Sequence, residues 1–154
     1  MAHLYTATIA WQRGDNDEFA KGRYSRVHSW RFDGGIAVPA SASPLVVPKP
    51  YADEAAIDPE EAFVASIASC HMLTFLDLAR RAGFVIDAYD DAATGEMAKN
   101  DAGRYWVAKV VLDPKIVWVD KEPSREELAK LHHDAHELCF IANSVKTEVT
   151  VEGF

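Results

Sequence analysis

The chain has 154 residues, of which 49% are hydrophobic, so it is long and apolar enough to build the core of one domain over residues 1–154. Its formal net charge of −8 argues against a surface that neutralises phosphates, and we expect no nucleic-acid partner. Two cysteines, Cys70 and Cys139, are too few for a disulfide scaffold or a four-thiolate metal site.

The sequence shows no targeting or membrane signal. Its first residues contain no basic region followed by an apolar stretch, and no apolar run reaches the roughly 18 residues typical of a membrane span. We therefore expect a cytoplasmic protein that does not contact a membrane. Thiols are kept reduced in the cytosol, so the two cysteines are either a reactive pair or two small buried hydrophobic residues.

The first third of the chain predicts two strands and an irregular connection. Residues 4–13 and 23–32 are rich in side chains that favour strands. A turn is expected at residues 33–35, where aspartate precedes two glycines. Four prolines within residues 39–50 predict an extended connection, because proline fixes φ and cannot donate a backbone hydrogen bond.

A long helix is predicted to begin at Asp58. Asp58 can cap the helix, Pro59 suits the first helical position, and Gly83 suits the residue after its end, which gives a helix of about 24 residues. The first two-thirds of this helix is apolar on nearly every side. In a domain this small, such a helix indicates that a second subunit covers part of it.

The rest of the chain predicts a hairpin, a second helix and a final strand. Residues 84–99 and 104–119 are expected to be two long strands joined by a turn at residues 100–103. A capping box opens a helix over residues 124–138, and residues 145–152 alternate as a last strand. The predicted fold class is therefore α+β, with mostly antiparallel strand pairing.

The two cysteines occupy different kinds of position. Cys70 lies in the middle of the long apolar helix, and Cys139 lies at the end of the second helix. A cysteine on a rigid element suits an attacking thiolate, whereas a cysteine at the end of an element suits a resolving thiol that must rearrange.

A thiolate on an apolar helix needs a nearby positive charge, because burial raises the pKa of a thiol. An arginine is the natural partner, and Arg23, Arg26 and Arg31 are the candidates, of which we favour Arg26. Glu60 is the acid expected to hold that arginine in place. The alternative is that Arg26 is a solvated strand residue and Glu60 only complements the helix dipole.

A histidine cluster offers a weaker metal hypothesis. His132 and His136 are spaced to face one side of a helix, and Cys139 follows, a pattern that can seat zinc. The glutamate of a catalytic HExxH motif is absent, and the alternative is a face of solvated or locally hydrogen-bonded histidines, so we expect no metal. His71 points about 100° away from Cys70 around the helix and is expected to be a packing or interface residue.

Two sequence segments resemble a known family. Residues 58–63 (DPEEAF) and 65–71 (ASIASCH) resemble the central helix of the OsmC/Ohr family, the osmotically induced and organic hydroperoxide resistance proteins. Cys139 and residues 144–149 resemble the second cysteine and the closing strand of that family. The chain departs from the family at Phe140, where proline is usual, and residues 25–50 resemble a less characterised OsmC-like branch.

The resemblance implies an intertwined homodimer, with long central helices packed between β-sheets and two active sites at the dimer interface. It implies a cysteine-based peroxidase without haem, flavin or metal, which reduces organic hydroperoxides to alcohols and is restored by an external dithiol. Cys70 matches the peroxidatic cysteine and Cys139 the resolving cysteine. Glu60 matches the acid that orients the arginine, for which Arg26 is the best match.

Two other interpretations share this scaffold. The protein is then either a non-catalytic dimer whose interface cavity binds a small apolar ligand, or a different thiol-dependent enzyme. All three interpretations share the apolar helix, and they differ in the reactivity of the thiols. For the peroxidase, apolar surroundings of Cys70 favour an organic hydroperoxide over hydrogen peroxide.

Overall fold

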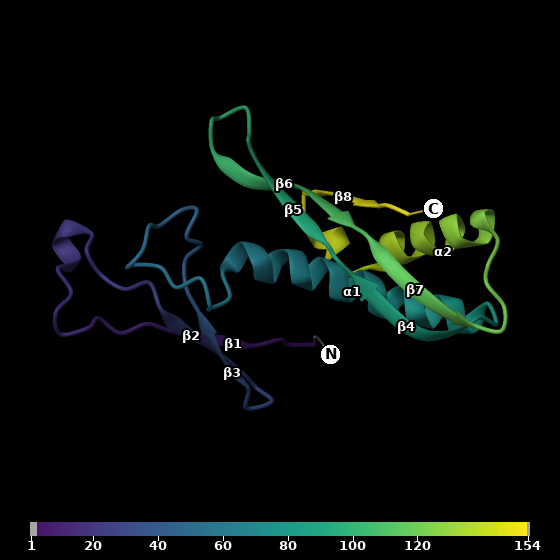
Figure 1. Cartoon of the computed structure of the whole chain (residues 1–154), viewed down its shortest axis with the longest axis horizontal. Coiled ribbons are helices and arrows are strands. Elements are labelled where there is room, and N and C mark those ends of the chain that lie inside the picture. Colours follow the sequence, from purple (N-terminus) through teal and green to yellow (C-terminus); the bar gives the residue numbers. More distant parts are fainter. Residues whose placement is uncertain (1–2, 154) are drawn as a thin grey trace. The chain divides into compact units, whose positions relative to one another are not determined.

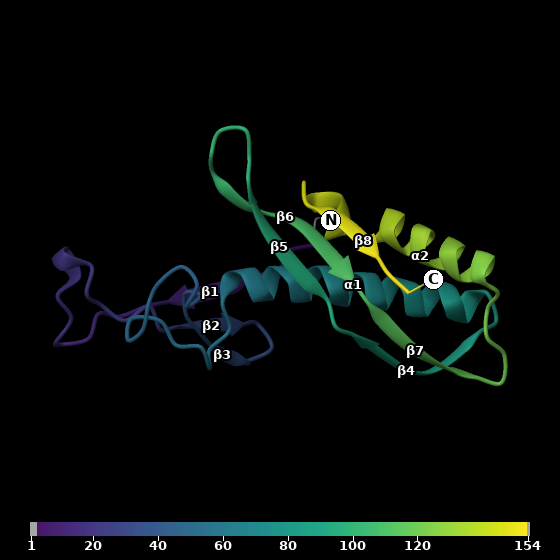
Figure 2. The same cartoon turned by 45° about the horizontal axis from the view of Figure 1, so that its top comes forward.

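The computed structural model describes residues 3–153, in two compact units that divide between Ala62 and Phe63. It confirms the α+β class, with one long helix and largely antiparallel strand pairing (Figures 1 and 2). Each unit is described in turn. The expectation of a single domain over residues 1–154 stays a prediction.

The first unit contains one antiparallel sheet of three strands. They pair in the order β1-β2-β3 and comprise β1 (Ala7–Ala10), β2 (His28–Phe32) and β3 (Ala37–Ala40), with a 3-10 helix η1 (Phe19–Lys21) between β1 and β2. The two predicted strands are thus present but shorter than expected. Arg23 and Arg26 precede β2, whereas Arg31 lies within it.

Residues 39–50 contain no helix, as predicted, but they begin within a strand that the sequence did not predict, because Pro39 belongs to β3. Pro39 pairs with Ser29 of β2, and β3 is the edge of the sheet. An edge strand tolerates a proline, since the missing backbone N–H can face away from the neighbouring strand. The proline signal therefore hid a short edge strand.

The remaining elements follow in chain order as one long helix, two hairpin ladders, a second helix and a last strand. They are α1 (Pro59–Arg81), β4 (Val85–Asp91), β5 (Thr94–Lys99), β6 (Tyr105–Leu112), β7 (Pro114–Val119), α2 (Arg125–Leu138), a 3-10 helix η2 (Ala142–Ser144) and β8 (Glu148–Val151). β4 pairs with β7 and β5 with β6, both antiparallel, and β8 joins β6 in parallel. In Figure 2, α2 runs alongside the C-terminal half of α1.

The two long strands predicted over residues 84–99 and 104–119 are each broken in two. The carboxylate of Asp91 accepts a hydrogen bond from the backbone N–H of Asp113 at 2.8 Å, which closes the β4–β7 ladder at that point. Pro114 follows and has no backbone N–H to continue the ladder of β6. The hairpin turn at residues 100–103 is confirmed, with Asn100 N–H donating to the carbonyl of Arg104.

Both ends of α1 are fixed by local hydrogen bonds, as the sequence predicts. Asp58 and Glu61 form a capping box, in which each carboxylate accepts a hydrogen bond from the other residue's backbone N–H. At the C-terminal end Gly83 adopts a φ of 84°, and the N–H of Phe84 donates to the carbonyl of Ala79. The helix spans 23 residues.

Two apolar clusters hold α1 in the second unit. One cluster joins α1, α2 and the residues beside β4, and its buried members are Phe75, Ala79, Phe84, Leu131 and Ala135. The other joins α1 to β6 through Ile67, Val110 and Leu112. Cys70 lies between the α1 positions that anchor these two clusters, so the helix is fixed on both sides of it.

α1 also bears on the question of membrane contact. It is the one helix among residues 3–153 that is long and apolar enough to cross a membrane by length and composition, with a mean hydropathy of 1.6. Core helices of soluble proteins pass the same test. The cytoplasmic location and the lack of membrane contact therefore stay predictions.

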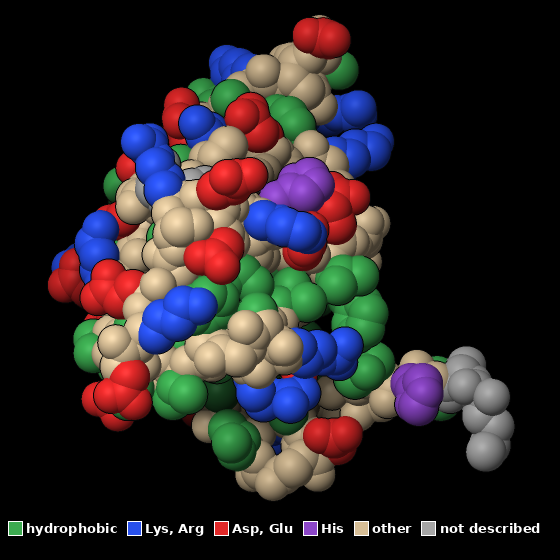
Figure 3. Space-filling view, turned by 90° about the vertical axis from the view of Figure 1, so that its right-hand side faces the viewer, with side chains coloured by type: hydrophobic (Ala, Val, Ile, Leu, Met, Phe, Trp, Pro, Cys, Tyr) green, Lys and Arg blue, Asp and Glu red, His purple; other side chains and the backbone are tan. Residues whose placement is uncertain are grey.

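The surface carries mixed charges. On the face in Figure 3, Lys and Arg side chains alternate with Asp and Glu, and hydrophobic side chains are exposed between them. This face therefore has no continuous basic surface of the kind that follows a nucleic-acid backbone.

Gly95 of β5 provides a test of how closely the sheet packs on α1. A Cβ at this position would lie 2.5 Å from Cγ2 of Val64. We therefore expect Gly95→Ala to lower the free energy of unfolding by about 1–3 kcal/mol, and Val64→Ala to relieve part of that loss in the double variant. Urea unfolding measures both.

The matched control for this prediction is Gly34→Ala, because a Cβ there meets no atom within 4 Å and Gly34 does not require a positive φ. We expect it to change the free energy of unfolding by less than about 0.5 kcal/mol. Equal effects of the two glycine substitutions would contradict the close packing of β5 on α1.

Candidate functional site

Cys70 is a free, half-buried thiol on α1. The hydroxyl of Thr74, one turn further along, donates a hydrogen bond to the carbonyl of Cys70 at 2.9 Å. The helix positions on its core side, Ile67 and His71, are almost completely buried. Cys70 thus lies at the edge of the buried stripe of α1, on a fixed backbone and with part of its side chain open to solvent.

Cys139 is the residue that caps the C-terminal end of α2, and its side chain is fully buried. The backbone N–H of Ala142 donates to its Sγ at 3.4 Å. The side-chain amide of Asn143 donates to the carbonyl of Cys139 at 3.0 Å. The predicted position at the helix end is confirmed, and the segment after the helix folds back to hold it.

The structure brings the two cysteines together. The side chain of Cys139 lies near that of Cys70, close enough for Cys70 to affect its pKa. Burial, and then the neighbouring Cys70, raise the pKa of Cys139, so this group is a protonated thiol at neutral pH. The pair therefore contains one thiol that solvent reaches and one buried thiol beside it.

Arg26 lies in the loop before β2, in contact with its own segment. Its guanidinium carbon lies 3.6 Å from the centre of the Tyr24 ring, and Nη1 donates to the carbonyls of Gly22 and Tyr24. Arg23, by contrast, pairs with Glu18 at 2.8 Å, and Arg31 is exposed on β2. Arg26 is thus the best-fixed of the three candidate arginines.

A short hydrogen-bond chain supports the backbone of Arg26. The indole N–H of Trp30 donates to Nε2 of His28 at 2.9 Å, so Nδ1 of His28 carries the ring proton. That Nδ1 donates to the carbonyl of Arg26 at 2.7 Å. A chain of two hydrogen bonds therefore links Trp30, His28 and the backbone of Arg26.

Glu60 is half-buried in the first turn of α1. The neighbouring acids Asp58 and Glu61 satisfy the capping box between them, which leaves the carboxylate of Glu60 outside the cap. Within residues 3–153, Glu60 and Arg26 do not form an ion pair with each other. The roles of both residues stay predictions.

A buried histidine pair, which the sequence did not predict, joins α1 to α2 beside the cysteines. Nε2 of His71 lies 3.0 Å from Nδ1 of His132, and the rings are nearly coplanar, at 7°. The two side chains are 1% and 2% exposed. Phe75 stacks on the ring of His132 with centroids 4.3 Å apart. The expectation that His71 is a packing residue agrees with this contact.

The histidine pair changes the interpretation of α2. His132 is not solvated, as one alternative expected, but directed into the core. Among residues 3–153, no group of three or more His, Cys, Asp or Glu side chains is arranged to hold a metal ion. A signal was present in the sequence, since His71 and His132 each follow the apolar stripe of their helix, but pairing across helices cannot be deduced from one chain segment.

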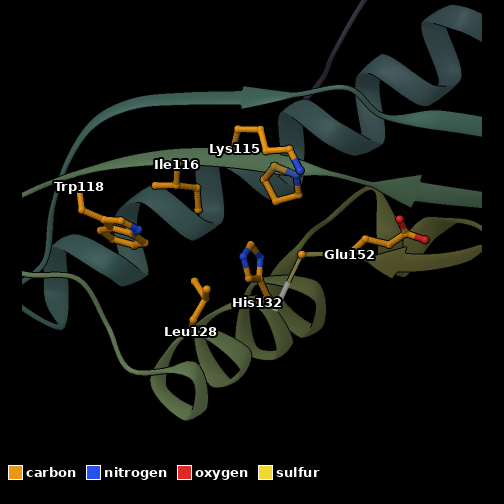
Figure 4. A pocket seen from close by; sticks show the side chains of 8 residues that line it. Lys115, Ile116, Trp118, Leu128, His132 and Glu152 are labelled. Carbon is orange, nitrogen blue, oxygen red and sulfur yellow. The ribbon is translucent and has the colours of Figure 1, made fainter.

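A pocket of about 260 Å³ lies beside His132 (Figure 4). It is bounded by α2, β7 and the end of β8 and is lined by Pro114, Lys115, Ile116, Trp118, Leu128, His132, Glu152 and Gly153. In Figure 4, His132 points from α2 toward β7, with Trp118 and Ile116 on one side and Glu152 on the other. The pocket contains neither cysteine.

Comparisons with known proteins identify the family of the chain. The profile of the OsmC-like protein family matches residues 52–153. A solved OsmC-like protein of unknown function from Vibrio cholerae is 49% identical, with 98% of this chain and 99% of that chain covered and a TM-score of 0.95. The chain belongs to the OsmC-like family. The resemblance to the OsmC/Ohr family is thereby confirmed.

More distant members of the family share the fold. An organic hydroperoxide resistance protein from Elizabethkingia anophelis is 16% identical, with a TM-score of 0.72 over 100% of this chain and 99% of that chain. The protein OhrB of Bacillus subtilis, also an organic hydroperoxide resistance protein, is 18% identical, with a TM-score of 0.63 over 97% of each chain. A comparison with curated proteins gave no match.

The histidine pair of this family member predicts a loss of stability in mild acid. Burial is the main cause that lowers the pKa of His71 to about 4 and that of His132 to about 3. Below about pH 6.5 the unfolded chain takes up protons that the folded protein does not, so the folded state is destabilised as the pH falls toward 4. The raised pKa of Asp91, caused first by burial, opposes this effect.

We expect the free energy of unfolding to fall by about 2 kcal/mol or more between pH 7 and pH 5. Urea unfolding at one fixed protein concentration measures this fall. In the double variant His71→Gln/His132→Asn the fall is expected to be smaller, because neither replacement titrates in this range. An equal fall in the double variant would assign the effect to other groups.

Proposed function

We propose that the protein is a thiol-dependent peroxidase that reduces organic hydroperoxides to alcohols. The observation that carries this proposal is the pair of free thiols, with half-buried Cys70 near fully buried Cys139. The family adds support, because two of its solved members of the same fold are organic hydroperoxide resistance proteins. This implies a role in the response to peroxide stress.

The chemistry divides between the two thiols. The Cys70 thiolate attacks the distal oxygen of the hydroperoxide, the O–O bond breaks, and the sulfur becomes a sulfenic acid while the alkoxide takes a proton and leaves as the alcohol. The Cys139 thiol then attacks that sulfur, which forms the disulfide and releases one water. An external dithiol reduces the disulfide and returns both thiols, with no haem, flavin or metal.

The differing exposure of the thiols supports this order of events. A peroxide reaches the half-buried Cys70, whereas Cys139 has no solvent-exposed surface. The raised pKa of Cys139 keeps it protonated, and therefore a poor competing nucleophile, until Cys70 has been oxidised. The exposed apolar side chains near the pair, Leu73 at 61% and Phe140 at 82%, favour a substrate with an apolar body.

In this mechanism Arg26 stabilises the Cys70 thiolate and the charge that develops on the leaving oxygen, and Glu60 orients Arg26. Arg26 is favoured because its guanidinium is held by Tyr24 and by backbone carbonyls, and because the His28–Trp30 chain fixes its backbone. Its planar fork suits simultaneous contact with a sulfur and an oxygen.

The working form is proposed to be a homodimer. Large apolar side chains remain exposed on the β4–β7 ladder, among them Val85 at 57% and Val117 at 53%. A soluble chain covers such surfaces when it can, and a second copy of the same chain is the partner that the family resemblance implies.

The two cysteine variants test the proposed chemistry. Cys70→Ser should lose all consumption of cumene hydroperoxide above background, because the attacking sulfur is gone. Cys139→Ser should react once and stop, with a sulfenic acid on Cys70 that dimedone traps and mass spectrometry detects. With a dithiol such as dihydrolipoamide, the wild type should turn over and favour cumene hydroperoxide over hydrogen peroxide by at least tenfold in kcat/KM.

Two results would overturn parts of the proposal. If Cys70 stays reduced in the presence of one equivalent of cumene hydroperoxide, the protein is not a peroxidase and a non-catalytic binding protein becomes the better interpretation. Equal kcat/KM values for cumene hydroperoxide and hydrogen peroxide would remove the proposed preference for organic substrates and leave the thiol chemistry intact.

The arginine assignment has its own test. We expect Arg26→Lys to lower kcat/KM for the hydroperoxide by about 10- to 100-fold, because lysine keeps the charge and loses the planar fork. Arg23→Lys and Arg31→Lys are the matched controls and should stay within threefold of the wild type. Glu60→Gln should lower kcat/KM by about tenfold, because it removes the charge that orients the guanidinium.

The peroxide reaction of each variant is followed under single-turnover conditions by the loss of free thiols. A larger effect at Arg23 or Arg31 than at Arg26 would move the role to that residue. Unchanged kcat/KM in Glu60→Gln would leave Glu60 as a residue of the helix start only.

A further inference from the structure

The contact between α1 and α2 contains two pairs of polar side chains. One is the Cys70–Cys139 pair and the other is the His71–His132 pair. The residues on α1 are adjacent, and those on α2 are seven positions apart, which is nearly two helical turns and therefore places them on the same face. The two pairs thus depend on the same rotation of α2 about its axis and on the same position of α2 along α1.

The apolar part of this contact holds the two helices together. It is built from Phe75, Ala79, Leu131 and Ala135, and apolar packing carries no preferred direction. A hydrogen bond between two buried ring nitrogens 3.0 Å apart does have a direction, because one nitrogen must donate to the lone pair of the other. Breaking it would leave buried ring nitrogens unpaired, which is costly.

Disulfide formation needs the geometry that such a bond can fix. The Cα atoms of bridged cysteines lie about 4.4–6.8 Å apart, and one turn of sliding moves a helix by about 5.4 Å. Rotation of α2 by one residue, about 100°, would direct Cys139 away from α1. Small errors in the seating of α2 therefore separate the thiols.

We propose that His71 and His132 are positioning residues, whose hydrogen bond holds α2 at the rotation and height that keep Cys139 against Cys70. The proposal deepens the proposed function, because it assigns the resolving step to a geometry set outside the thiols. The histidines take no part in proton transfer and touch no substrate in this role. They act through the placement of Cys139.

The direct test measures how strongly the fold holds the two thiols together. Each protein is equilibrated with oxidised and reduced glutathione, in the reaction in which one oxidised glutathione converts the dithiol to the disulfide and yields two reduced glutathiones. The equilibrium constant gives the effective concentration of Cys139 at Cys70. No hydroperoxide is involved, so this test can fail or succeed independently of the peroxidase proposal.

We expect His132→Leu to lower that equilibrium constant by tenfold or more, since leucine fills much of the space and cannot form the bond. His132→Asn should stay within threefold of the wild type, because its amide can occupy the place of Nδ1. The matched control is His133→Leu at the exposed neighbouring position, and it should also stay within threefold. Thermal unfolding establishes that each variant is folded.

The same comparison can be made from α1. His71→Met is expected to lower the equilibrium constant tenfold. His71→Gln should stay within threefold of the wild type, because its amide can replace Nε2. An equilibrium constant equal to that of the wild type in both His132→Leu and His71→Met would overturn the proposal. Equal losses in the apolar and amide variants would overturn it as well, because ring shape and not the hydrogen bond would then matter. If the apolar variants do not fold, a tenfold loss of the equilibrium constant in either amide variant would also overturn the proposal.

Discussion

The seating of α2 against α1 is the constraint on which the candidate site depends. A thiol pair is useful only if two sulfur atoms from distant parts of the chain lie within bonding reach, and here they come from the middle of one helix and the end of another. The apolar cluster around Phe75 and Ala135 holds the helices together, and the buried histidine pair gives the contact a direction. The end of α2 is then fixed by Asn143, which bonds the carbonyls of Glu137 and Cys139.

The same packing gives the two thiols different environments. Cys70 lies at the edge of the buried stripe of α1, where it keeps some exposure, while Cys139 is covered completely. Burial opposes ionisation, so the covered thiol stays protonated and the open thiol is the group available to an oxidant. The division of labour that we propose for the cysteines therefore rests on their positions, before any other residue is considered.

Local signals in the sequence predicted the local structure well. The caps at Asp58 and Ser124 set the start of both helices and the glycine at position 83 sets the end of α1 as expected, because these signals act over three or four residues. The sequence also placed Cys70 within a helix and Cys139 at a helix end. The proximity of the two cysteines needed the fold.

The failures of sequence reasoning involve contacts between distant segments. The long strands break where Asp91 bonds to Asp113, a pairing across 22 residues that neither segment reveals. The sequence did not predict β3, because Pro39 argues against a strand unless the strand is known to lie at the edge of a sheet. The His71–His132 bond spans 61 residues, whereas the sequence indicated only a packing or interface role for His71 and a cluster with His136 for His132.

The measurement that tests the central claim most directly is peptide mapping of the wild-type protein after one equivalent of cumene hydroperoxide per chain. The account predicts one product at every protein concentration, an intrachain disulfide between Cys70 and Cys139, with a loss of two hydrogens per chain and no covalent dimer. An interchain Cys70–Cys70 linkage, or a sulfinic acid on Cys70 with Cys139 still free, would contradict the claim that the fold holds these two thiols as a redox pair.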